Sequence, residues 1–345
     1  MVRRTQPVTM KDVAERAGVS QATVSLVLNN VRGSRVADAT RDRVMGAVRD
    51  LGYSTNAFAR SLRSGESGMI GFISDEVASS PFAGELLKGA QLLAWETGNV
   101  ILGVDTFGDP GLEAAAVDTM LSYRVRGVVY ASMFHRVVEV PEGLAGVPTV
   151  VVNAQDGAGL VPSVFPDEEL GGYTATRHLV EAGHSRIAMI NIQSPDSSLP
   201  AGIGRLAGYR RALDEAGIAE RPDWVRYGTG IVEDGLALTT ELMSASDRPT
   251  AIFCGNDRTA WGAYRALERL GLRTPQDCSI VGFDNHQMVA PYLDPGLTTL
   301  ELPYEQMATT AVEILLSGAP DTAGAHPVEC SLISRGSVTE AKVPA

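Results

Sequence analysis

The sequence predicts two kinds of structure: a small all-α headpiece built on a helix-turn-helix, and a larger α/β domain that follows it. Three observations predict this division. Residues 8–51 contain helix-capping signals with apolar residues at helical spacing, short β-branched runs alternate with helices from Met69 onward, and the charge changes sign between the two parts. With 345 residues, the chain is long enough for two or three domains that each bury a core.

The first helical segment reads VTMKDVAERAGVSQATVSLVLNN from Val8. Thr9 followed by Asp12 matches a capping box, so a helix is predicted to begin just after Thr9 and to end at Gly18. Ser20 can cap a second helix. Two short helices about a glycine turn is the geometry that places the second helix in the major groove of DNA. A packed αα-hairpin fits the apolar pattern equally well.

A third helix is predicted over Thr40–Leu51, closed by Gly52. The loop before it, VRGSRVAD from Val31, carries two arginines that fit either phosphate contacts or a solvated basic turn. Residues 1–65 contain 11 Lys or Arg and 5 Asp or Glu (net +6), whereas the rest of the chain contains 18 and 36 (net −18). A cationic module on an anionic body is suited to attraction by phosphates.

The stretch Tyr53–Gly65, read YSTNAFARSLRSG, predicts a further short helix. Asn56 can cap it, Leu62 lies on its apolar side, and Arg60 and Arg63 lie on the other side. Such a helix is too short to hold alone in water, so we expect it to form only against another surface.

From Met69 the pattern is that of parallel sheets covered on both faces, with more strands than one compact sheet usually carries. The predicted strands are Ile70–Ser74, Val100–Val104, Gly127–Ala131, Thr149–Asn153, Ile187–Asn191, Ala251–Cys254 and Ser279–Phe283. The predicted helices are Phe82–Trp95, Leu112–Tyr123, Leu170–Ala182, Arg205–Ala216, Asp234–Ala245, Thr259–Leu270 and Tyr304–Leu316.

The motifs resemble those of the lac repressor (LacI/GalR) family of bacterial transcription regulators. The resemblance rests on V-T-x-x-D-V-A-x-x-A-G-V-S-x-x-T-V-S at Val8–Ser25, T-R-x-R-V at Thr40–Val44 and G-Y-x-x-N-x-x-A-R-x-L at Gly52–Leu62. It covers essentially the whole chain. It implies an all-α helix-turn-helix headpiece plus an α/β periplasmic-binding-protein-like effector domain of two parallel-sheet lobes.

The resemblance also implies how the chain is divided. We expect a DNA-binding headpiece over residues 1–53, a hinge helix and linker over 54–67, and a two-lobed effector-binding and dimerisation domain over 68–340. The amino-terminal lobe is expected to comprise about 68–163 and 303–321, and the carboxy-terminal lobe about 164–302 and 322–340. The implied crossovers between lobes lie near Val164, Leu302 and Thr322. A ligand would then bind in the cleft, at the carboxyl ends of strands.

At the DNA interface the resemblance implies base contacts by Gln21, Ala22 and Leu26. Gln21 can pair bidentately with adenine. Leu26 stands where the family usually has arginine; since leucine cannot pair with guanine, it contacts a thymine methyl or specificity comes from elsewhere. The full set of implied DNA-binding residues is Thr9, Ser20, Gln21, Ala22, Thr23, Ser25, Leu26, Asn29, Asn56, Ala59 and Leu62. Of these, Thr9, Ser20, Thr23 and Ser25 are better suited to phosphate contacts or helix capping.

Leu62 has two interpretations. It is either one more apolar residue of a marginal helix or a wedge inserted into the minor groove, where unstacking costs a few kcal/mol that bending must offset. The family pattern favours the wedge, although Thr55 replaces the proline that the family commonly has at the start of this helix.

The effector cleft calls for carboxylates, amides, an arginine fork and an aromatic face, which together recognise a polyol. By resemblance the candidates are Asp75, Phe82, Asn153, Phe165, Arg205, Asn256, Asp257, Asp284 and Tyr304. Several of them follow predicted strands, where ligands bind in such sheets. Structural roles are open for three of them: Asp257 as a helix cap, Phe82 as a core residue and Asp284 as the anchor of a loop.

Enzymatic chemistry has little support. Cys254, Cys278 and Cys330 have no metal-ligand spacing, and the five histidines look structural. Gly202-x-Gly204-x-x-Ala207 matches the dinucleotide fingerprint only superficially, because it does not directly follow a strand. We therefore expect no catalytic residue, no cofactor and no metal, and hence no enzyme.

The sequence thus favours a ligand-responsive DNA-binding regulator, a repressor of a carbohydrate-utilisation operon that a sugar-like effector releases from operator DNA. One alternative is an exported sugar-binding protein, which would need a signal peptide that we do not expect at this amino terminus. The other is a nucleotide-dependent enzyme, which leaves residues 8–65 unexplained. We expect a cytoplasmic protein without a membrane segment, because no run of about 18 apolar residues occurs, and we expect it to bind pseudo-palindromic DNA. The tail after Ser334 has no leucine heptads, so a homodimer is preferred to a coiled-coil tetramer. Whether the effector releases DNA or strengthens binding is left open.

Overall fold

The computed structural model describes residues 8–28, 36–53, 67–77, 84–194, 196–318 and 324–341. The chain divides into two compact units, Met1–Gly68 and Met69–Ala345. Each unit is described by itself.

The first unit contains the three predicted headpiece helices, α1 (Met10–Ala17), α2 (Gln21–Leu28) and α3 (Asp38–Leu51). The capping box of α1 is confirmed, since Thr9 and Asp12 each accept the other's backbone N–H. Gly18 ends α1 in the left-handed conformation, where a glycine is favoured because it has no Cβ. The helices bury a small apolar core of Val13, Ala14, Ala17, Val24, Val27, Val44 and Ala47.

In the second unit, the described strands form two six-stranded sheets, so the predicted pair of sheets is confirmed. The first sheet has the order β11-β5-β4-β3-β1-β2, and its pairs are parallel. Its strands are β1 (Met69–Ser74), β2 (Val100–Asp105), β3 (Val128–Val138), β4 (Thr149–Asp156), β5 (Ser163–Pro166) and β11 (Ala325–Val328). The helices of this lobe are α5 (Gly84–Glu96), α6 (Pro110–Ser122), the short η1 (Glu142–Leu144) and α11 (Tyr304–Ser317).

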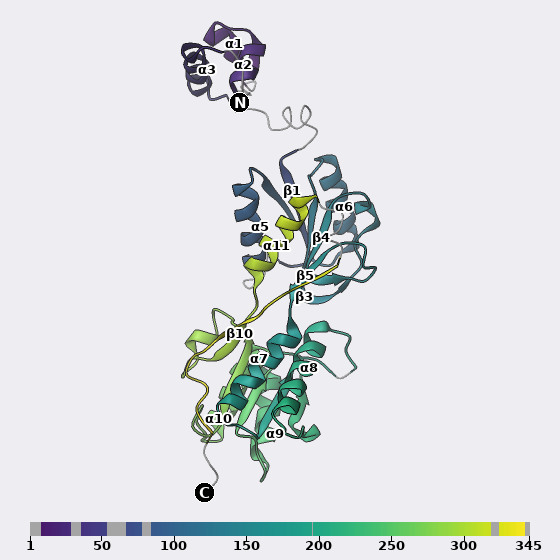
Figure 1. Ribbon diagram of the computed structural model, residues 1–345, viewed down its shortest axis with the longest axis vertical. Helices are drawn as coiled ribbons and strands as arrows, with labels where there is room; N and C mark the ends of the chain where they lie inside the picture. The colour runs from purple at the N-terminus through teal and green to yellow at the C-terminus, as the bar shows by residue number, and fades with distance from the viewer. Residues whose placement is uncertain are drawn as a thin grey trace, which may run out of the picture. The chain divides into compact units, whose positions relative to one another are not determined.

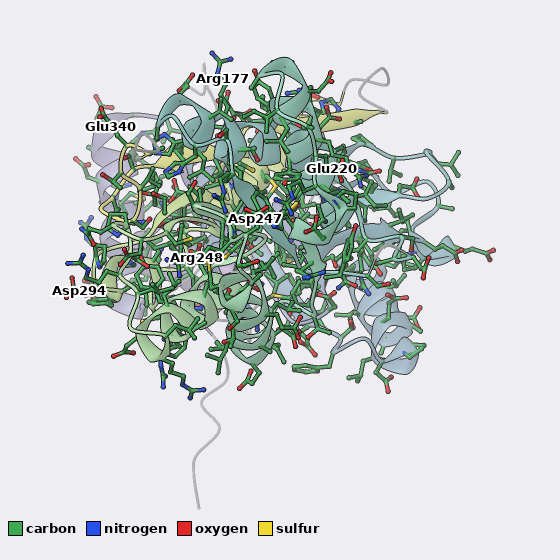
Figure 2. All side chains as sticks on the ribbon, turned by 90° about the horizontal axis from the view of Figure 1, so that it is seen from below. Arg177, Glu220, Asp247, Arg248, Asp294 and Glu340 are labelled. Atoms are coloured by element: carbon green, nitrogen blue, oxygen red, sulfur yellow. The ribbon has the colours of Figure 1, made fainter. Side chains whose placement is uncertain are left out.

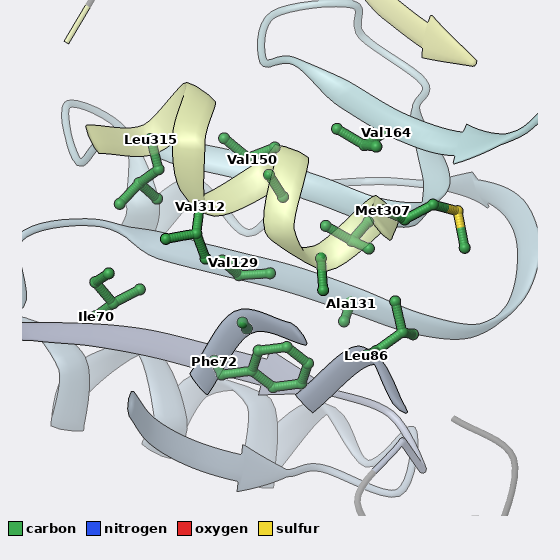
Figure 3. Close-up of a cluster of buried hydrophobic side chains, with 14 of the residues drawn as sticks. Ile70, Phe72, Leu86, Val129, Ala131, Val150, Val164, Met307, Val312 and Leu315 are labelled. Carbon is green, nitrogen blue, oxygen red and sulfur yellow. The ribbon is translucent and has the colours of Figure 1, made fainter. Parts of the chain in front are cut away.

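The core of this first lobe lies between the sheet and the helices α5 and α11 (Figure 3). Phe72 of β1, Val129 of β3 and Val150 of β4 are buried there against Leu86 of α5 and Val312 of α11. The uninterrupted apolar runs of these strands are explained by burial on both faces, because α6 covers the other side of β1.

The second sheet has the order β12-β10-β9-β8-β6-β7, and it is parallel except for β12. Its strands are β6 (Ile187–Asn191), β7 (Val225–Tyr227), β8 (Ala251–Cys254), β9 (Ser279–Asp284), β10 (Thr298–Glu301) and β12 (Ser331–Ile333). The helices of this lobe are α7 (Glu168–Glu181), α8 (Pro200–Glu215), α9 (Val232–Ser244) and α10 (Asp257–Arg269), with the short η2 (Pro222–Trp224) and η3 (Ala290–Tyr292). Figure 1 shows these helices around the second sheet.

Glycines allow the helices of the second lobe to pack closely. A Cβ added to Gly204 of α8 would lie 2.6 Å from the Cβ of Glu168 on α7, and Gly172 and Gly208 face the backbone of the opposite helix. This close approach brings Arg205 of α8 next to Glu168, which is one reason why a charged pair can form at the edge of the second lobe.

Each predicted strand and helix of the α/β domain is found, with shifted ends. The largest difference at a helix start is α8, which begins at Pro200 and not at Arg205. The strands β5, β7, β10, β11 and β12 were not predicted; they are three or four residues long and too short for a clear alternation.

The three connections between lobes follow β5, β10 and β11. The first two agree with the expected positions near Val164 and Leu302. The third is a correction: Thr322 lies outside the described residues, but β11 still pairs with β5 of the first sheet, so the chain crosses between Val328 and Ser331.

Charged side chains lie mainly on the outside of the second unit, as Arg177 and Asp247 illustrate in Figure 2, with 57% and 56% of their side-chain areas exposed. Among the described helices, none combines the length and apolar character that a bilayer span requires.

Candidate functional sites

The outer face of α2 is uncharged and exposed. Gln21, Ala22 and Leu26 all face solvent, and 39% of Leu26 is exposed although the neighbouring Val24 and Val27 are buried. The Gln21 amide can form hydrogen bonds with base edges, and the apolar side chains of Ala22 and Leu26 can contact thymine methyl groups. The three residues expected to contact bases therefore share one accessible face of the second headpiece helix.

Three of the polar residues expected at the DNA interface take part in helix capping. Thr9 belongs to the capping box of α1, and the Ser20 hydroxyl accepts the backbone N–H of Thr23 at 3.1 Å at the start of α2. The Ser20 and Thr23 hydroxyls also lie 3.0 Å apart. These bonds set the entry geometry of both helices, and Ser25 lies half-buried further along α2.

Four residues expected at the DNA interface lie outside the described residues, namely Asn29, Asn56, Ala59 and Leu62. The same applies to Phe82, which was expected in the effector cleft.

The second unit contains a cavity of about 690 Å³ to which both lobes contribute. Its walls come from the end of β3, from the ends of β6 and β9, from the start of α10 and from the connection between β10 and α11. The carboxyl ends of parallel strands are where ligands bind in open α/β sheets. The volume falls within the range of about 300–1,000 Å³ that is usual for small-molecule sites.

The structure brings five of the nine expected cleft residues to this cavity: Asn153, Arg205, Asn256, Asp284 and Tyr304. Asn256 both caps α10, by accepting the Thr259 N–H at 2.8 Å, and donates to the Gly230 carbonyl at 2.9 Å. Its amide is therefore fixed in place at the cavity wall.

Arg205 is buried and held by several partners. Its Nε donates to Glu168 Oε2 at 2.7 Å, its Nη1 donates to the Gly255 carbonyl and lies 3.6 Å from Asp284 Oδ1, and its guanidinium stacks over the Phe283 ring. Burial alone would lower the pKa of Arg205, but Glu168 and Asp284 raise it. Burial would likewise raise the pKa of Glu168, but Arg205 and His135 lower it below its ordinary value. Both groups of the pair are therefore ionised.

Glu168 and Asp284 both line the cavity, and Asp284 is the more exposed of the two, with 28% of its side chain exposed against 4% for Glu168. Burial raises the pKa of Asp284 above the ordinary range, and Arg205 acts in the opposite direction. This carboxyl group lies at the carboxyl end of β9, where it can accept hydrogen bonds from a ligand.

Asp257 does not line the cavity; it lies behind the wall and supports it. Its carboxyl oxygens accept the Thr299 hydroxyl at 2.6 Å and the His286 backbone N–H at 2.7 Å. Burial raises its pKa, and the nearby Asp284 raises it further. Asp257 is the first residue of α10 and Asn256 is its cap, so the alternative role of Asp257 as the helix cap is wrong.

Asp75 and Phe165 also lie outside the cavity lining, and both support residues that form it. Asp75 accepts the Met133 N–H at 2.7 Å and the Ser132 hydroxyl at 3.0 Å, and it pairs with Arg136 at 2.9 Å. Phe165 stacks on His135, with the ring centroids 4.9 Å apart. Both residues therefore shape the wall that the first lobe contributes.

Backbone strain is concentrated at the cavity. Among the described non-glycine residues with positive φ, three line it: Asn153 (53°), Asp284 (109°) and Asn285 (48°). Such conformations cost energy and persist where the surroundings fix them, which is common at ligand sites.

Sequence reasoning missed several residues at or behind the cavity, chiefly His135, Arg136, Glu168, Arg258, His286 and Met288. His135 and His286 had been read as structural histidines without a site. No local motif marks them, because they reach the cavity through strand ends and loops that are distant in sequence; the position of Arg258 directly after Asn256 and Asp257 was the one available signal.

Comparisons with known proteins agree with this architecture. Residues 9–56 match the family "Bacterial regulatory proteins, lacI family", and residues 176–338 match the family "Periplasmic binding protein-like domain". The chain is 33% identical over 315 residues to the HTH-type transcriptional repressor PurR of Photobacterium profundum, an alignment that covers 91% of this chain and 92% of that protein.

Solved structures give the same result. The lac repressor dimer bound to operator and the anti-inducer ONPF is 28% identical, with a TM-score of 0.77, and covers 97% of this chain and 100% of its own. The transcriptional regulator CelR in complex with cellobiose is 29% identical, with a TM-score of 0.66, and covers 96% of this chain and 99% of its own.

The headpiece, the two-sheet domain and these matches define a bacterial transcription regulator with a periplasmic-binding-protein-like domain. The chain belongs to the LacI family. It is a DNA-binding transcriptional repressor of that family and not an enzyme.

Proposed function

We propose that this repressor controls a carbohydrate-utilisation operon and leaves its operator when a small sugar-like molecule occupies the cleft. The observation that carries the proposal is the cavity of about 690 Å³, in which Asn153, Arg205, Asn256 and Asp284 converge. A carboxylate, two amides and a guanidinium fork provide the acceptors and donors that vicinal hydroxyl groups require. Tyr304 at the same wall offers a flat face for the apolar side of a sugar ring.

The solved relative in complex with cellobiose supports a sugar as the ligand class. The curated relatives are named PurR repressors, and that name mentions no sugar. A screen therefore has to include other small molecules besides carbohydrates.

On DNA, we propose that the protein acts as a homodimer on a pseudo-palindromic operator in the cytoplasm, with Gln21, Ala22 and Leu26 reading the major groove. The lac repressor that it resembles was solved as a dimer bound to operator. Exposed apolar residues on α5 and β2 support an interface on the first lobe, since Leu92, Trp95 and Val100 expose 51%, 76% and 48% of their surface. Dimer linkage raises the effective concentration of the second headpiece at its half-site.

The proposed mechanism couples the cleft to the DNA through the hinge helix and linker at the end of the first unit. The hinge helix over residues 54–67, with Leu62 as its minor-groove wedge, pairs with its copy on the operator. Effector binding displaces the first lobe, disfavours that pairing and weakens DNA binding by about 5- to 150-fold, the usual scale of such coupling.

The first test identifies both ligands of the full-length protein. A random-sequence duplex library is selected for binding, and the recovered operator is then titrated with and without candidate effectors found by thermal shift among sugars, sugar phosphates and nucleobases. We expect a palindromic operator whose affinity falls when a sugar binds. Stabilisation by nucleobases alone would overturn the sugar assignment, and a rise in operator affinity would reverse the sign of the response.

A second test concerns the wedge. Leu62→Ala is expected to stay folded and to lose most operator affinity, because bending without intercalation brings less surface into contact. Unchanged affinity in a fluorescence-anisotropy titration would argue against an inserted leucine.

A further inference from the structure

A row of buried polar side chains connects the cavity floor, formed by Arg205 and Asp284, to the first sheet. Arg205 of α8 donates to Glu168 Oε2 at 2.7 Å, and Glu168 Oε1 lies 3.3 Å from Nδ1 of His135 on β3. All three side chains are only 4% exposed. Glu168 and Arg205 belong to helices of the second lobe, whereas His135 belongs to a strand of the first, so this row crosses between the lobes.

The imidazole of His135 is fixed by residues of the first sheet. Its ring stacks on Phe165 of β5, and its Nε2 lies 3.1 Å from the amide nitrogen of Gln155 on β4. With one nitrogen facing Gln155 and the other facing Glu168, the ring has little freedom to move by itself. A shift of Glu168 is therefore transmitted to β3.

From His135, the path continues along the backbone to Arg136 and then through hydrogen bonds to the residue after the first strand of the domain. Arg136, the next residue, pairs with Asp75 at 2.9 Å, and Asp75 also accepts the Met133 N–H. Asp75 directly follows β1, which begins at Met69, the first residue after the headpiece unit. A connected set of contacts thus joins the cavity floor to the strand on which the second unit begins.

We propose that His135 is a positioning residue that couples the charge at the cavity floor to the strands β3 and β1 of the first lobe. Asp284 is the switchable end of this path, because it faces the cavity and lies 3.6 Å from Arg205. A ligand that bonds to Asp284 or Arg205 alters their mutual attraction in a poorly solvated site, and Arg205 adjusts against Glu168. This role deepens the proposed function, since it names the route by which an occupied cleft would act on the first lobe.

A purely structural role for His135 makes a different prediction. If His135 only fills space, its loss and a change at Asp284 perturb the protein independently, and their effects add. If it carries the coupling, a change at Asp284 reaches the first sheet only while His135 is present. A substitution cycle separates the two cases, and it requires neither the effector nor the operator.

The experiment measures amide hydrogen exchange in the full-length protein for Asp284→Asn, His135→Asn and the double variant. Asparagine is chosen for position 284 because it removes the charge and tolerates the positive φ of 109°. We expect Asp284→Asn alone to change exchange in Val128–Val138 and Met69–Ser74 about three- to tenfold. In the His135→Asn background the same substitution should leave these strands unchanged.

Equal changes in both backgrounds, or none in either, would overturn the proposal. Asp247→Asn is the matched control: it removes an exposed acid of the second lobe, paired with Arg186 and Arg221, and should not affect β1 or β3. If His135→Asn does not fold, Gln155→Leu takes its place in the cycle, because it removes the amide that contacts Nε2 of the His135 ring. If the exchange cycle shows coupling but no sugar changes operator affinity, the sugar assignment is rejected and the path through His135 is retained.

Discussion

The residues proposed to act in the headpiece and those at the cavity floor, or cleft floor, differ in their exposure and in the sequence separation of their partners. In the headpiece, Gln21, Ala22 and Leu26 are exposed, and the bonds that fix their helices join residues three positions apart, such as Thr9 and Asp12. In the cleft floor, Arg205 is buried and its partner Glu168 is 37 positions away. If the proposed roles hold, we therefore expect that DNA recognition can be changed without loss of stability, whereas changes at the cleft floor affect stability as well.

The largest expected effect concerns the buried ion pair between Glu168 and Arg205. Glu168→Ala leaves the Arg205 guanidinium buried without its closest carboxylate, and removal of one partner of a buried pair typically costs about 3–5 kcal/mol. We expect this loss in the free energy of unfolding, measured by urea denaturation of the full-length protein.

The matched control is an exposed pair in the same lobe. Glu220 pairs with Arg210 at 3.0 Å, but the two side chains are 30% and 50% exposed. Glu220→Ala should therefore cost no more than about 1 kcal/mol. Similar losses in the two variants would show that burial of the Glu168–Arg205 pair does not determine its contribution.

The second prediction concerns the exposed outer face of α2. Gln21→Ala removes the one amide on the outward face of α2 and should weaken operator binding by about 1–3 kcal/mol, roughly 5- to 150-fold. Its melting temperature should match that of the unsubstituted protein, because Gln21 is exposed and outside the headpiece core. Fluorescence anisotropy and thermal unfolding measure the two quantities separately. A lower melting temperature with unchanged affinity would show that Gln21 contributes to stability and not to DNA recognition, contrary to the expectation.

The same contrast explains how much could be predicted from the sequence. The headpiece was predictable because its signals are local: the capping box of Thr9, the glycine at position 18 and the apolar spacing all lie within one or two helical turns. The fully buried strands were predictable for a similar reason, since a strand such as β6 is a continuous, mainly apolar run of five residues.

The cleft was predictable only in part. Asn256 and Asp284 stand within motifs at strand ends, Arg205 stands within a motif of α8, and all three line the cavity. Asp257 has the same sequence neighbourhood but points behind the wall, because Gly282 of β9 leaves room for its carboxylate there. His135 could not be found, since its contacts with Glu168 and Phe165 depend on how the two lobes meet.

A third, smaller effect returns to the headpiece. Thr9→Ala removes the hydroxyl that caps α1 and should cost about 1 kcal/mol of local stability. The amides at the start of α1 should exchange about fivefold faster in the full-length protein. Unchanged exchange would mean that the Asp12 carboxylate, which also accepts the Thr9 backbone N–H, is sufficient to cap this helix.

The last expected effect concerns Asp257, whose contribution to stability depends on pH. Burial raises the pKa of Asp257 from its ordinary value of 3.8 to about 8. Between these two values the folded protein retains a proton that the unfolded chain has released, so stability falls as the pH rises through this interval. Asp257→Asn removes that dependence while keeping an oxygen that can accept a hydrogen bond from Thr299 or His286. The melting temperature of the variant relative to the unsubstituted protein should therefore increase from pH 5 upward and level off above about pH 8. A constant difference across that range would show that Asp257 is ionised throughout, and that the polar groups around it stabilise the buried carboxylate more than burial destabilises it.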